Sequence, residues 1–540
     1  MGLEVVIGTN GSQALASRTP GRVLRLPFES PEAAIRQVRA LDPFVATVGV
    51  DEESTLLAAR IAEALGLPHN PVESMLAAGN KLRLREMLVR AGVPSPEWQV
   101  FRLDEDPRAL SARVPFPCVL KPLVLSASRG VMRADDPDGF VRAHGRLARI
   151  LSGPDLPERE PDALSRFLVE RFVPGPEVAV EGLLERGRLH VLALFDKPDP
   201  LDGPFFEETI YVTPSRLPEA SREAIARTTE LATRAMGLTT GPIHAELRLP
   251  SPEAPVVIEV AARTIGGLCG RTLRFGTGLS LEEVVLAQAS GREPGSLVRE
   301  TAAAGVLMLP IPRGGVLREV RGLEAARAVP GVEEVEITMH VGQEVVPLPE
   351  GARYPGFVFA RGASPAEVES ALRSAGAAIE LGIESSLRFR AATNADGPAI
   401  RGVVHGVLRE FALTPEPGGT DADIEDVERH YLEPGGAFEV VVDAGGRVVG
   451  TAGFVPLTGA ACELRKMYLL PEARGRGLGR RLLDHVVDLA RARGFVEMRL
   501  ETASVLADAI RLYVRYGFER YTSEHMVPRC DQAFRLDLRR

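Results

Sequence analysis

The stretch Gly241–Gly267, GPIHAELRLPSPEAPVVIEVAARTIGG, predicts a hairpin. It contains two runs of alternating polarity, His244–Leu249 and Val256–Val260, and a proline-rich turn, PSPEAP, joins them. A turn centred in that segment sets Glu246 opposite Glu259 on one face of the hairpin, with their Cβ atoms roughly 5 Å apart. The two carboxylates are therefore expected to act as a pair.

Two ionised carboxylates in such a pair repel each other unless a cation lies between them, and hard oxygen ligands suit Mg²⁺ or Mn²⁺. Arg263 follows soon after Glu259, and Gly266 and Gly267 allow close approach of the backbone. The alternative is a solvated hairpin face that carries two glutamates by chance. This stretch by itself leaves both interpretations open.

Length and composition set limits on the function. At 540 residues the chain has room for three or four domains. Its net charge of −9 gives no support to nucleic-acid binding, which would favour a basic surface. The start, MGLEVVIGTN, lacks the basic region of a signal peptide, and no apolar run approaches the roughly 18 residues of a membrane span. The four cysteines are far apart, which indicates no disulfide framework. We expect a cytoplasmic protein that binds neither nucleic acid nor membranes.

Lysine is rare in this chain. Of the 64 basic residues only four are lysines, namely Lys81, Lys121, Lys197 and Lys466. Arginine is the usual basic residue of this chain, so chance explains the position of each lysine less easily than in most proteins. A lysine is a compact point charge, whereas an arginine is a broad fork.

Residues 1–95 alternate strand and helix, which predicts a parallel α/β domain. Strands are expected at Leu3–Ile7, Arg22–Leu26 and Phe44–Val50, with a helix opening at Ser30 and another over Ser54–Leu65. The glycines after the first strand do not form a GxGxxG pattern, so no dinucleotide site is inferred.

A candidate phosphate site follows. A helix from about Asn80 to Ala91 carries Lys81 in its first turn, and the strand Pro117–Pro122 has Lys121 near its end. The backbone N–H groups and hydroxyls of the next loop, LSASRGVM, could wrap an anionic phosphate, with Arg129 adding charge. A plain surface hairpin loop is the alternative.

Residues 167–236 continue with strands, turns and a helix. Glu170 and Phe172 leave the first strand, and Glu177 begins the second after a Pro-Gly-Pro turn. Lys197 lies in the loop FDKPDPLDGPFFEET, where it could touch a phosphate or an acid substrate, or stay solvated. An amphipathic helix, Glu219–Met236, leads back to the hairpin.

Taken in order, Lys81, Lys121 with LSASRG, VERFVPGPE and E…E-x-x-x-R resemble an ATP-grasp ligase of the carboxylate–amine (amino-acid) group. The resemblance covers about residues 1–385 and implies an α/β and α+β multidomain chain. A pre-ATP-grasp Rossmann-like domain is expected at 1–95, two ATP-grasp lobes at 96–300 and a C-terminal lid at 301–385. In the lid a helix is expected over Pro365–Ala375, with Gly376 just past its end, and no catalytic residue is named there.

The resemblance implies a role for each matching residue. Those expected to hold ATP are two phosphate lysines, a loop over the phosphates, the hinge that reads adenine and a ribose acid, namely Lys81, Lys121, Ser126, Ser128, Arg129, Gly130, Glu170, Phe172 and Glu177. Glu246 and Glu259 match the Mg²⁺ carboxylates. Arg263 matches the cation that steadies the acyl-phosphate and the tetrahedral intermediate.

Two departures from the family pattern concern the metal and the phosphates. The family often has Asn two residues after the second metal carboxylate, where this chain has Ala261, so phosphate oxygens and water would fill the gap. The phosphate loop is also poorer in glycine than usual. The expected chemistry is phosphorylation of a carboxylate by ATP, followed by attack of an amine on the acyl-phosphate.

A second series of strands and helices begins near Leu387. Glu463–Leu470 is an alternating strand, and RGRGLG, Arg474–Gly479, leads into a helix that ends at Arg493. A glycine-containing loop at a helix N-terminus is an anion site suited to a pyrophosphate. The alternative is a basic loop that caps a surface helix.

Residues 386–540 resemble a GNAT acetyltransferase, which implies acetyl-CoA as the cofactor. The pyrophosphate loop would comprise Arg474, Gly475, Arg476, Gly477, Leu478, Gly479 and Arg480, and the backbone near Met467 and Leu469 would pair with pantetheine. Tyr513 matches the acid that protonates the departing thiolate, and Glu463 is a candidate base. The family's Asn seven residues before that Tyr is Leu506 here.

These resemblances predict a bifunctional enzyme: an ATP-dependent carboxylate–amine ligase fused to an N-acetyltransferase, with small-molecule acid and amine substrates and a homodimer left open. One alternative is an acyl-CoA synthetase fused to a protein acetyltransferase. Another is a protein in which one domain holds nucleotide or acetyl-CoA only as a regulatory ligand, which Ala261 and Leu506 keep open.

Overall fold

The protein folds into two compact units, Met1–Ile383 and Glu384–Arg540. The computed structural model describes residues 4–11, 21–41, 43–153, 156, 161–276, 278–293, 295–384, 387–443, 446–474, 477–523 and 526–539. The expected boundary after residue 385 lies two residues from this division. Each unit combines sheets and helices, which confirms the mixed α/β multidomain class.

The first unit begins with a two-stranded parallel sheet and four helices. Their bounds are β1 Val6–Thr9, β2 Arg22–Arg25, α1 Pro31–Arg39, α2 Glu52–Leu65, α3 Val72–Ala78 and α4 Lys81–Arg90. The strand expected at Phe44–Val50 is wrong, because no pairing forms there among the described residues. Gly49 instead lies against the start of α2, where a Cβ would come within 2.3 Å of the Cα atom of Thr55. Close packing on a helix takes the place of a sheet neighbour.

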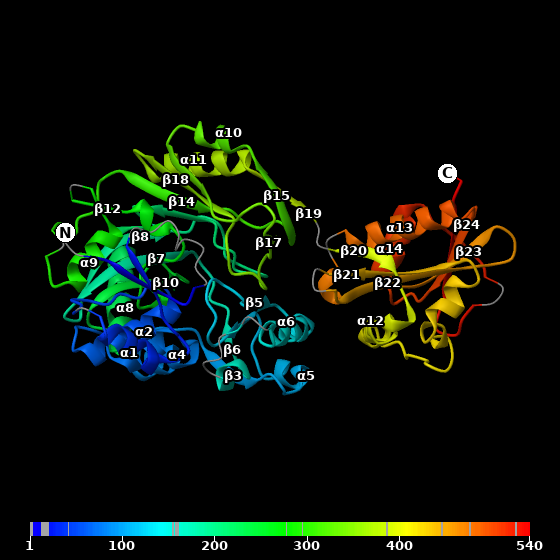
Figure 1. Ribbon diagram of the computed structural model, residues 1–540, viewed down its shortest axis with the longest axis horizontal. Helices are drawn as coiled ribbons and strands as arrows, with labels where there is room; N and C mark the ends of the chain where they lie inside the picture. The colour runs from blue at the N-terminus through cyan, green and yellow to red at the C-terminus, as the bar shows by residue number, and fades with distance from the viewer. Residues whose placement is uncertain are drawn as a thin grey trace. The chain divides into compact units, whose positions relative to one another are not determined.

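An eight-stranded sheet forms the centre of this unit, in the order β11-β10-β7-β8-β9-β14-β18-β16 (Figure 1). Its strands are β7 Glu177–Glu185, β8 Arg188–Asp196, β9 Ile210–Thr213, β10 Gly241–Arg248, β11 Val256–Ala261, β14 Ala303–Met308, β16 Val332–Ile337 and β18 Gly356–Gly362. Strands β7, β9, β14 and β18 are nearly continuous runs of buried residues, because helices pack on both faces of the sheet.

Alternation along β7 decides which side chains enter the core and which reach the site. Val178 and Val180 pack on the face covered by α4 and by α8, Glu219–Ala235. Ala179 and Leu183 pack on the opposite face, under α9, Leu281–Ala289. Successive side chains point to opposite faces of a strand, so Glu177 lies on the same face as Ala179.

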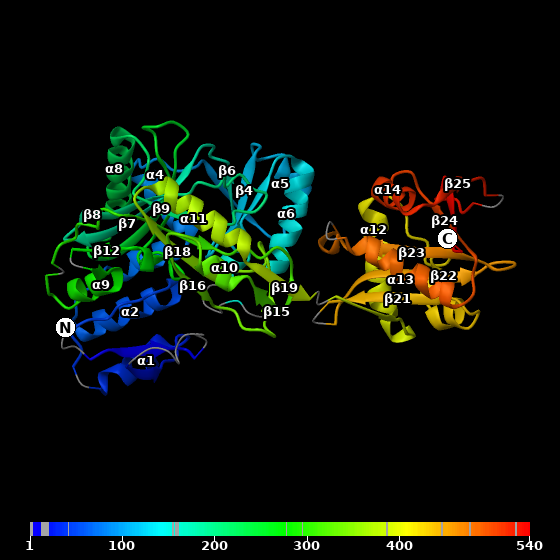
Figure 2. The same ribbon diagram turned by 90° about the horizontal axis from the view of Figure 1, so that it is seen from above.

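A four-stranded sheet, ordered β3-β6-β4-β5, stands beside the central sheet (Figure 2). Its strands are β3 Trp98–Arg102, β4 Cys118–Pro122, β5 Met132–Ala134 and β6 Arg166–Arg171, and the neighbouring helices are α5 Pro107–Ser111, α6 Pro137–Ile150 and α7 Pro161–Leu164. One face packs on α5 and α6 through Phe101, Phe140 and Phe167. This sheet supplies one wall of the pocket described below.

The last part of the first unit adds β12 Arg274–Phe275, β13 Leu279–Ser280, β15 Gly315–Arg321, α10 Leu323–Arg327, β17 Glu344–Val345, α11 Pro365–Ala378 and β19 Glu380–Glu384. Helix α11 covers β14 and β18. The expectation that Gly376 lies past its end is wrong, because the helix runs through this glycine. A Cβ at Gly376 would lie 2.5 Å from Leu307, so the glycine permits close helix–sheet packing rather than ending the helix.

The second unit is a seven-stranded sheet in the order β20-β21-β22-β23-β24-β26-β25. Figure 1 shows α12, Gly397–Glu410, on one side of it and α13, Leu478–Ala492, with α14, Ala507–Tyr516, on the other. The strands are β20 Arg388–Ala391, β21 Ala437–Val442, β22 Val448–Pro456, β23 Ala461–Leu469, β24 Glu497–Thr502, β25 Glu519–Tyr521 and β26 Gln532–Asp537.

Within the described ranges, none of the helices combines the length and the apolar character that crossing a membrane requires.

Candidate functional site

A pocket of about 660 Å³, open to solvent, lies between the four-stranded and the eight-stranded sheets. The predicted residues that line it are Lys81, Lys121, Ser126, Ser128, Glu170, Phe172, Glu177, Glu246 and Glu259. They come from α4, from β4 and its following loop, from β6 and the chain just after it, and from β7, β10 and β11. Gly130, Arg129 and Arg263 do not line it.

Lys81 is held at the start of α4. Asn80 caps this helix by accepting hydrogen bonds from the N–H groups of Leu82 and Arg83. The Lys81 ammonium donates to the carbonyl of Leu125 at 2.7 Å and lies 3.7 Å from a carboxylate oxygen of Glu259. It therefore joins the helix, the first residue of the candidate phosphate loop, and the hairpin.

Lys121 is fixed by a buried ion triad that the sequence did not predict. The Glu170 carboxylate lies 2.7 Å from Lys121 Nζ on one oxygen and 2.7 Å from Arg85 Nε on the other. Burial disfavours the ionised carboxyl, but the two cations outweigh it and hold the pKa of Glu170 at about 2. Arg85 lies one helical turn after Lys81 on α4, and that spacing could have revealed it.

The candidate phosphate loop turns tightly between β4 and β5. Ala127 and Ser128 adopt left-handed φ angles of 52° and 55°, a region that side chains other than glycine rarely enter. Gly130, at φ 75°, donates its N–H to the carbonyl of Pro349 at 2.8 Å. The low glycine content therefore does not prevent a compact loop, and the part of the chain expected to form the lid is in direct contact with it.

The hinge predicted to read adenine is anchored on both sides. The N–H of Phe172 donates to the carbonyl of Pro117 at 3.0 Å. The guanidinium groups of Arg133 and Arg248 lie 4.2 and 5.0 Å from the centre of the Phe172 ring. Because the Glu170 carboxylate is occupied by Lys121 and Arg85, its contact with adenine stays a prediction.

The hairpin pairs as the sequence predicts. Glu246 and Glu259 are cross-strand partners, with a bulge directly after Glu246. Their side chains are 17% and 28% exposed and line the pocket, so the alternative of a solvated hairpin face is wrong. Each carboxylate has its own cation: Lys81 lies near Glu259, and Lys197 lies 2.9 Å from Glu246.

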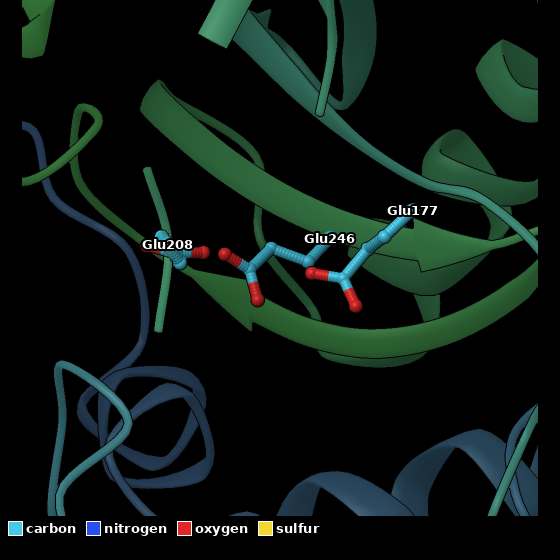
Figure 3. Close-up of side chains that lie close together, drawn as sticks. All are labelled: Glu177, Glu208 and Glu246. Atoms are coloured by element: carbon cyan, nitrogen blue, oxygen red, sulfur yellow. The ribbon is translucent and has the colours of Figure 1, made fainter. Parts of the chain in front are cut away.

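Lys197 is the centre of a carboxylate cluster that includes Glu177, Glu208 and Glu246. Figure 3 shows the Glu246 carboxylate between the other two. The Lys197 side chain is 3% exposed, so the expectation of a solvated loop lysine is excluded. Burial raises the pKa of Glu208 to about 7 against the opposing effect of Lys197. Glu208 was missed because it lies in the loop FDKPDPLDGPFFEET, whose path the local sequence does not indicate.

Glu181 and His244 form a second buried pair behind the cluster. His244 Nδ1 lies 3.3 Å from Glu181, and the N–H of Ile265 donates to the same carboxylate. Burial opposes the imidazolium, but the hydrogen bonds to Glu181 and Glu246 raise the pKa of His244 to about 9. The imidazolium of His244 therefore places positive charge next to Glu246.

Arg263 contacts the first domain of the chain rather than the pocket wall. Its Nε donates to Glu52 at 2.9 Å, and its Nη1 donates to the carbonyl of Thr264. Glu52 is the first residue of α2. The role predicted for Arg263 in steadying negative charge stays a prediction, and Glu52 is the partner that such a role would have to release.

The donor set of the pocket fits ATP and a hard divalent cation. Glu246 and Glu259 offer carboxylate oxygens from adjacent strands, the ligand type that Mg²⁺ prefers. Lys121 offers a compact positive charge from the four-stranded sheet, and Lys81 offers another from α4 beside Glu259. Ala261 contributes no side-chain oxygen.

In the second unit, β23 carries the backbone groups that are predicted to pair with pantetheine. A bulge sets Thr451 opposite Tyr468 and Gly453 opposite Arg465. Pairing of β23 with β24 stops at Leu464 and Leu500, although β23 continues to Leu469. Beyond Leu464 the backbone of β23, including Met467 and Leu469, therefore has no β24 partner in the ladder of the described residues.

Tyr513 lies beside this part of β23. Its side chain comes from α14, is 6% exposed, and its hydroxyl lies 3.8 Å from the sulfur of Met467. Burial raises the pKa of Tyr513 well above that of a free tyrosine, which keeps its proton available. Glu463, the candidate base, is on the same strand as Met467 and accepts from Arg465 Nε at 2.7 Å.

The N-terminus of α13 begins directly after Gly477, whose φ is 71° and whose Cβ position is open. Leu478, Gly479 and Arg480 form the first turn of this helix. Arg474 donates to both oxygens of Glu410 at 2.7 and 2.8 Å. The predicted positions Gly475 and Arg476 lie outside the described residues.

Sequence reasoning also missed a buried charge cluster below β23. Asp421 is fully buried and accepts hydrogen bonds from Lys466 and from both terminal nitrogens of Arg529. Lys466 belongs to the bulge, with φ 53°, and also donates to the carbonyl of Thr420. The rarity of lysine in this chain was the feature of the sequence that could have drawn attention to Lys466.

Comparisons with known proteins agree with this arrangement. Residues 114–272 match the ATP-grasp domain, 307–384 the L-amino acid ligase C-terminal domain 2, and 405–518 the acetyltransferase (GNAT) family. The crystal structure of an L-amino acid ligase from Bacillus licheniformis superposes with a TM-score of 0.60 and 30% identity, over 71% of this chain and 93% of that one.

Two curated relatives match different parts of the chain. Alanine–anticapsin ligase of Bacillus subtilis (strain 168) is 27% identical over 240 residues, which is 42% of this chain and 50% of that protein. The uncharacterized N-acetyltransferase YjgM of Escherichia coli (strain K12) is 43% identical over 136 residues, 24% of this chain and 81% of that protein. The chain therefore belongs to the ATP-grasp L-amino acid ligases and carries a C-terminal domain of the GNAT acetyltransferase family.

Proposed function

We propose that the first unit joins two amino acids through an amide bond at the expense of ATP, and that the second unit acetylates an amine with acetyl-CoA. The observation that carries the ligase proposal is the convergence of Lys81, Lys121, Glu246 and Glu259 on one pocket between two sheets. Amino acids are chosen as substrates because the relatives are amino-acid ligases by name. The match of residues 307–384 favours this function over an acyl-CoA synthetase.

In the first step, a carboxylate oxygen of one amino acid attacks the γ-phosphorus of ATP, and ADP leaves. Lys81 and Lys121 neutralise the phosphate oxygens, and the turn that contains Ser126 and Ser128 covers them. Glu246 and Glu259 would hold Mg²⁺, which supplies charge neutralisation at the transferring phosphoryl group.

In the second step, the amine of the other amino acid attacks the acyl carbon. The C–N bond forms, phosphate leaves with its oxygen, and the amine loses a proton. Arg263 would face the negative charge that develops on the tetrahedral intermediate. For this it must exchange its contact with Glu52 for the reacting group.

In the acetyltransferase unit, an acceptor amine attacks the acetyl carbon and the thiolate of CoA leaves. The backbone of β23 at Met467 and Leu469 would pair with the pantetheine arm, and the N-terminus of α13 at Gly477 would face the pyrophosphate. Glu463 would act as the base for the amine, and Tyr513 as the acid for the thiolate.

The test is a screen of phosphate release with ATP and Mg²⁺ over pairs of amino acids, followed by mass analysis with and without acetyl-CoA. We expect one or more pairs to release phosphate and to give a product lighter by one water than the sum of the pair. Glu259→Gln should remove this product and leave acetyl transfer intact, whereas Tyr513→Phe should do the reverse. Phosphate release that no amino acid changes would contradict the ligase proposal.

A further inference from the structure

Lys197 occupies the centre of the carboxylate cluster defined by Glu177, Glu208 and Glu246. Its ammonium donates to one oxygen of each, at 2.7, 2.5 and 2.9 Å respectively. A lysine ammonium has three N–H donors, so these three acceptors satisfy it completely. Among the described residues, this cluster is the group of three carboxylates whose ligand atoms all lie within 4.8 Å of one another.

The chain holds this ammonium in place. Lys197 directly follows Asp196, the last residue of β8, whose backbone pairs with Val178 and Val212 on either side. The Asp196 carboxylate accepts from the N–H and the side chain of Arg216. The ring of Tyr211 lies 5.0 Å from Lys197 Nζ. The lysine is thus attached to the middle of a sheet and closed in by an aromatic ring.

The surrounding groups fix the carboxylates independently of the lysine. Arg248 donates to Glu177 at 3.0 Å, and the hydroxyl of Tyr211 donates to Glu208 at 2.7 Å. Lys197 and His244 both contact Glu246 through the same oxygen, Oε1. Neither of these two contacts involves the other oxygen of Glu246. A divalent ion could enter the cluster only by displacing the ammonium.

We propose that Lys197 is a built-in cation that keeps divalent metal ions out of the Glu177–Glu208–Glu246 cluster and so confines the metal of the ligase reaction to Glu246 and Glu259. This inference rests on the proposed ligase function. Lys197 acts through Glu246 and is a positioning residue. Loss of its charge leaves three converging carboxylates without their central cation, an arrangement of oxygen ligands suited to Mg²⁺ or Mn²⁺.

The test counts bound Mn²⁺ by the loss of the free-ion signal in electron paramagnetic resonance. Full-length native protein, Lys197→Met and Lys197→Arg are titrated without nucleotide and with a non-hydrolysable ATP analogue. Lys197→Met should bind one additional Mn²⁺ without nucleotide, at least about tenfold more tightly than any ion bound by the native chain, because three carboxylates then lack a counter-charge. Lys197→Arg keeps the charge and should not gain the ion.

Matched variants locate the additional ion. The double variant Lys197→Met/Glu208→Gln removes one ligand and should lose it. Lys466→Met removes a buried lysine of the other unit and should leave the Mn²⁺ count unchanged. The inference is overturned if Lys197→Met and native protein bind the same number of ions without nucleotide, or if the double variant retains the additional ion.

A separate arm does not depend on the folding of the lysine variants. Glu208→Gln in the native background should keep the nucleotide-dependent Mn²⁺, because the proposal assigns that ion to Glu246 and Glu259. Loss of that ion would make Glu208 a direct ligand and overturn the inference. Native protein that binds no Mn²⁺ even with the ATP analogue would instead contradict the proposed ligase function, so the two failures are distinct.

Discussion

Replacement of Glu170 by Gln should destabilise the lobe built on the four-stranded sheet. Glu170 is 2% exposed and pairs with Arg85 and Lys121, whose side chains are 1% and 9% exposed. Its pKa of about 2, against an ordinary 4.5, corresponds to about 3 kcal/mol of stabilisation at neutral pH. This agrees with the roughly 3–5 kcal/mol that removal of one partner of a buried ion pair costs. We expect a loss of that size.

The single tryptophan of the chain makes this loss measurable in one part of the protein. Trp98 on β3 is the cross-strand partner of Glu170 on β6. Urea unfolding followed by Trp98 fluorescence therefore reports on this lobe and not on the acetyltransferase unit. The matched control is Asp138→Asn, which removes an exposed pair with Arg108 and should cost less than about 1 kcal/mol.

The dependence on pH has a definite sign. The folded-state pKa of Glu170 is depressed, so its contribution is complete above the unfolded pKa and is lost as pH falls toward about 2. The difference between native protein and Glu170→Gln should be constant from pH 8 to about pH 5.5 and should already be smaller by roughly 1 kcal/mol at pH 4. Equal urea midpoints for the two proteins at pH 7 would refute the reasoning, because they would mean that Arg85 and Lys121 need no carboxylate.

Three further outcomes follow from the two sites. Lys81→Met should raise the KM for ATP by roughly tenfold to a hundredfold, because a charge-assisted phosphate contact is lost. Steady-state kinetics at varied ATP check this, and an unchanged KM would contradict the assignment of Lys81. Tyr513→Phe should slow acetyl transfer by about a hundredfold with little change in the KM for acetyl-CoA, and single-turnover CoA release checks this. Chelation of divalent ions with EDTA should stop ADP formation and leave acetyl transfer unaffected, and an equal loss of both activities would contradict separate sites.

Local sequence was sufficient wherever neighbours along the chain decide the structure. The hairpin of β10 and β11 pairs Glu246 with Glu259 because strand alternation and turn length together set its register. Helix α4 begins at Lys81 because Asn80 caps it. The predicted strand at Phe44–Val50 failed because Gly49 brings that segment onto α2, a contact that strand propensity does not describe.

Partners that are distant in sequence were decided by the tertiary structure. Lys197 meets Glu177, Glu208 and Glu246 across separations of 20, 11 and 49 residues. Arg263 meets Glu52 across 211 residues. A buried charge takes whichever counter-charge the packed sheets bring within reach, and the sequence shows only which charges exist.

The sequence by itself therefore determined the two catalytic families, the order of the predicted site residues and the hairpin that pairs Glu246 with Glu259, because these depend on local spacing. The tertiary structure decided which cation neutralises which carboxylate: Lys121 with Glu170, Lys81 with Glu259, and Lys197 with Glu246. That choice depends on distances and burial, since the free energy of an ion pair is set by its geometry and its access to water.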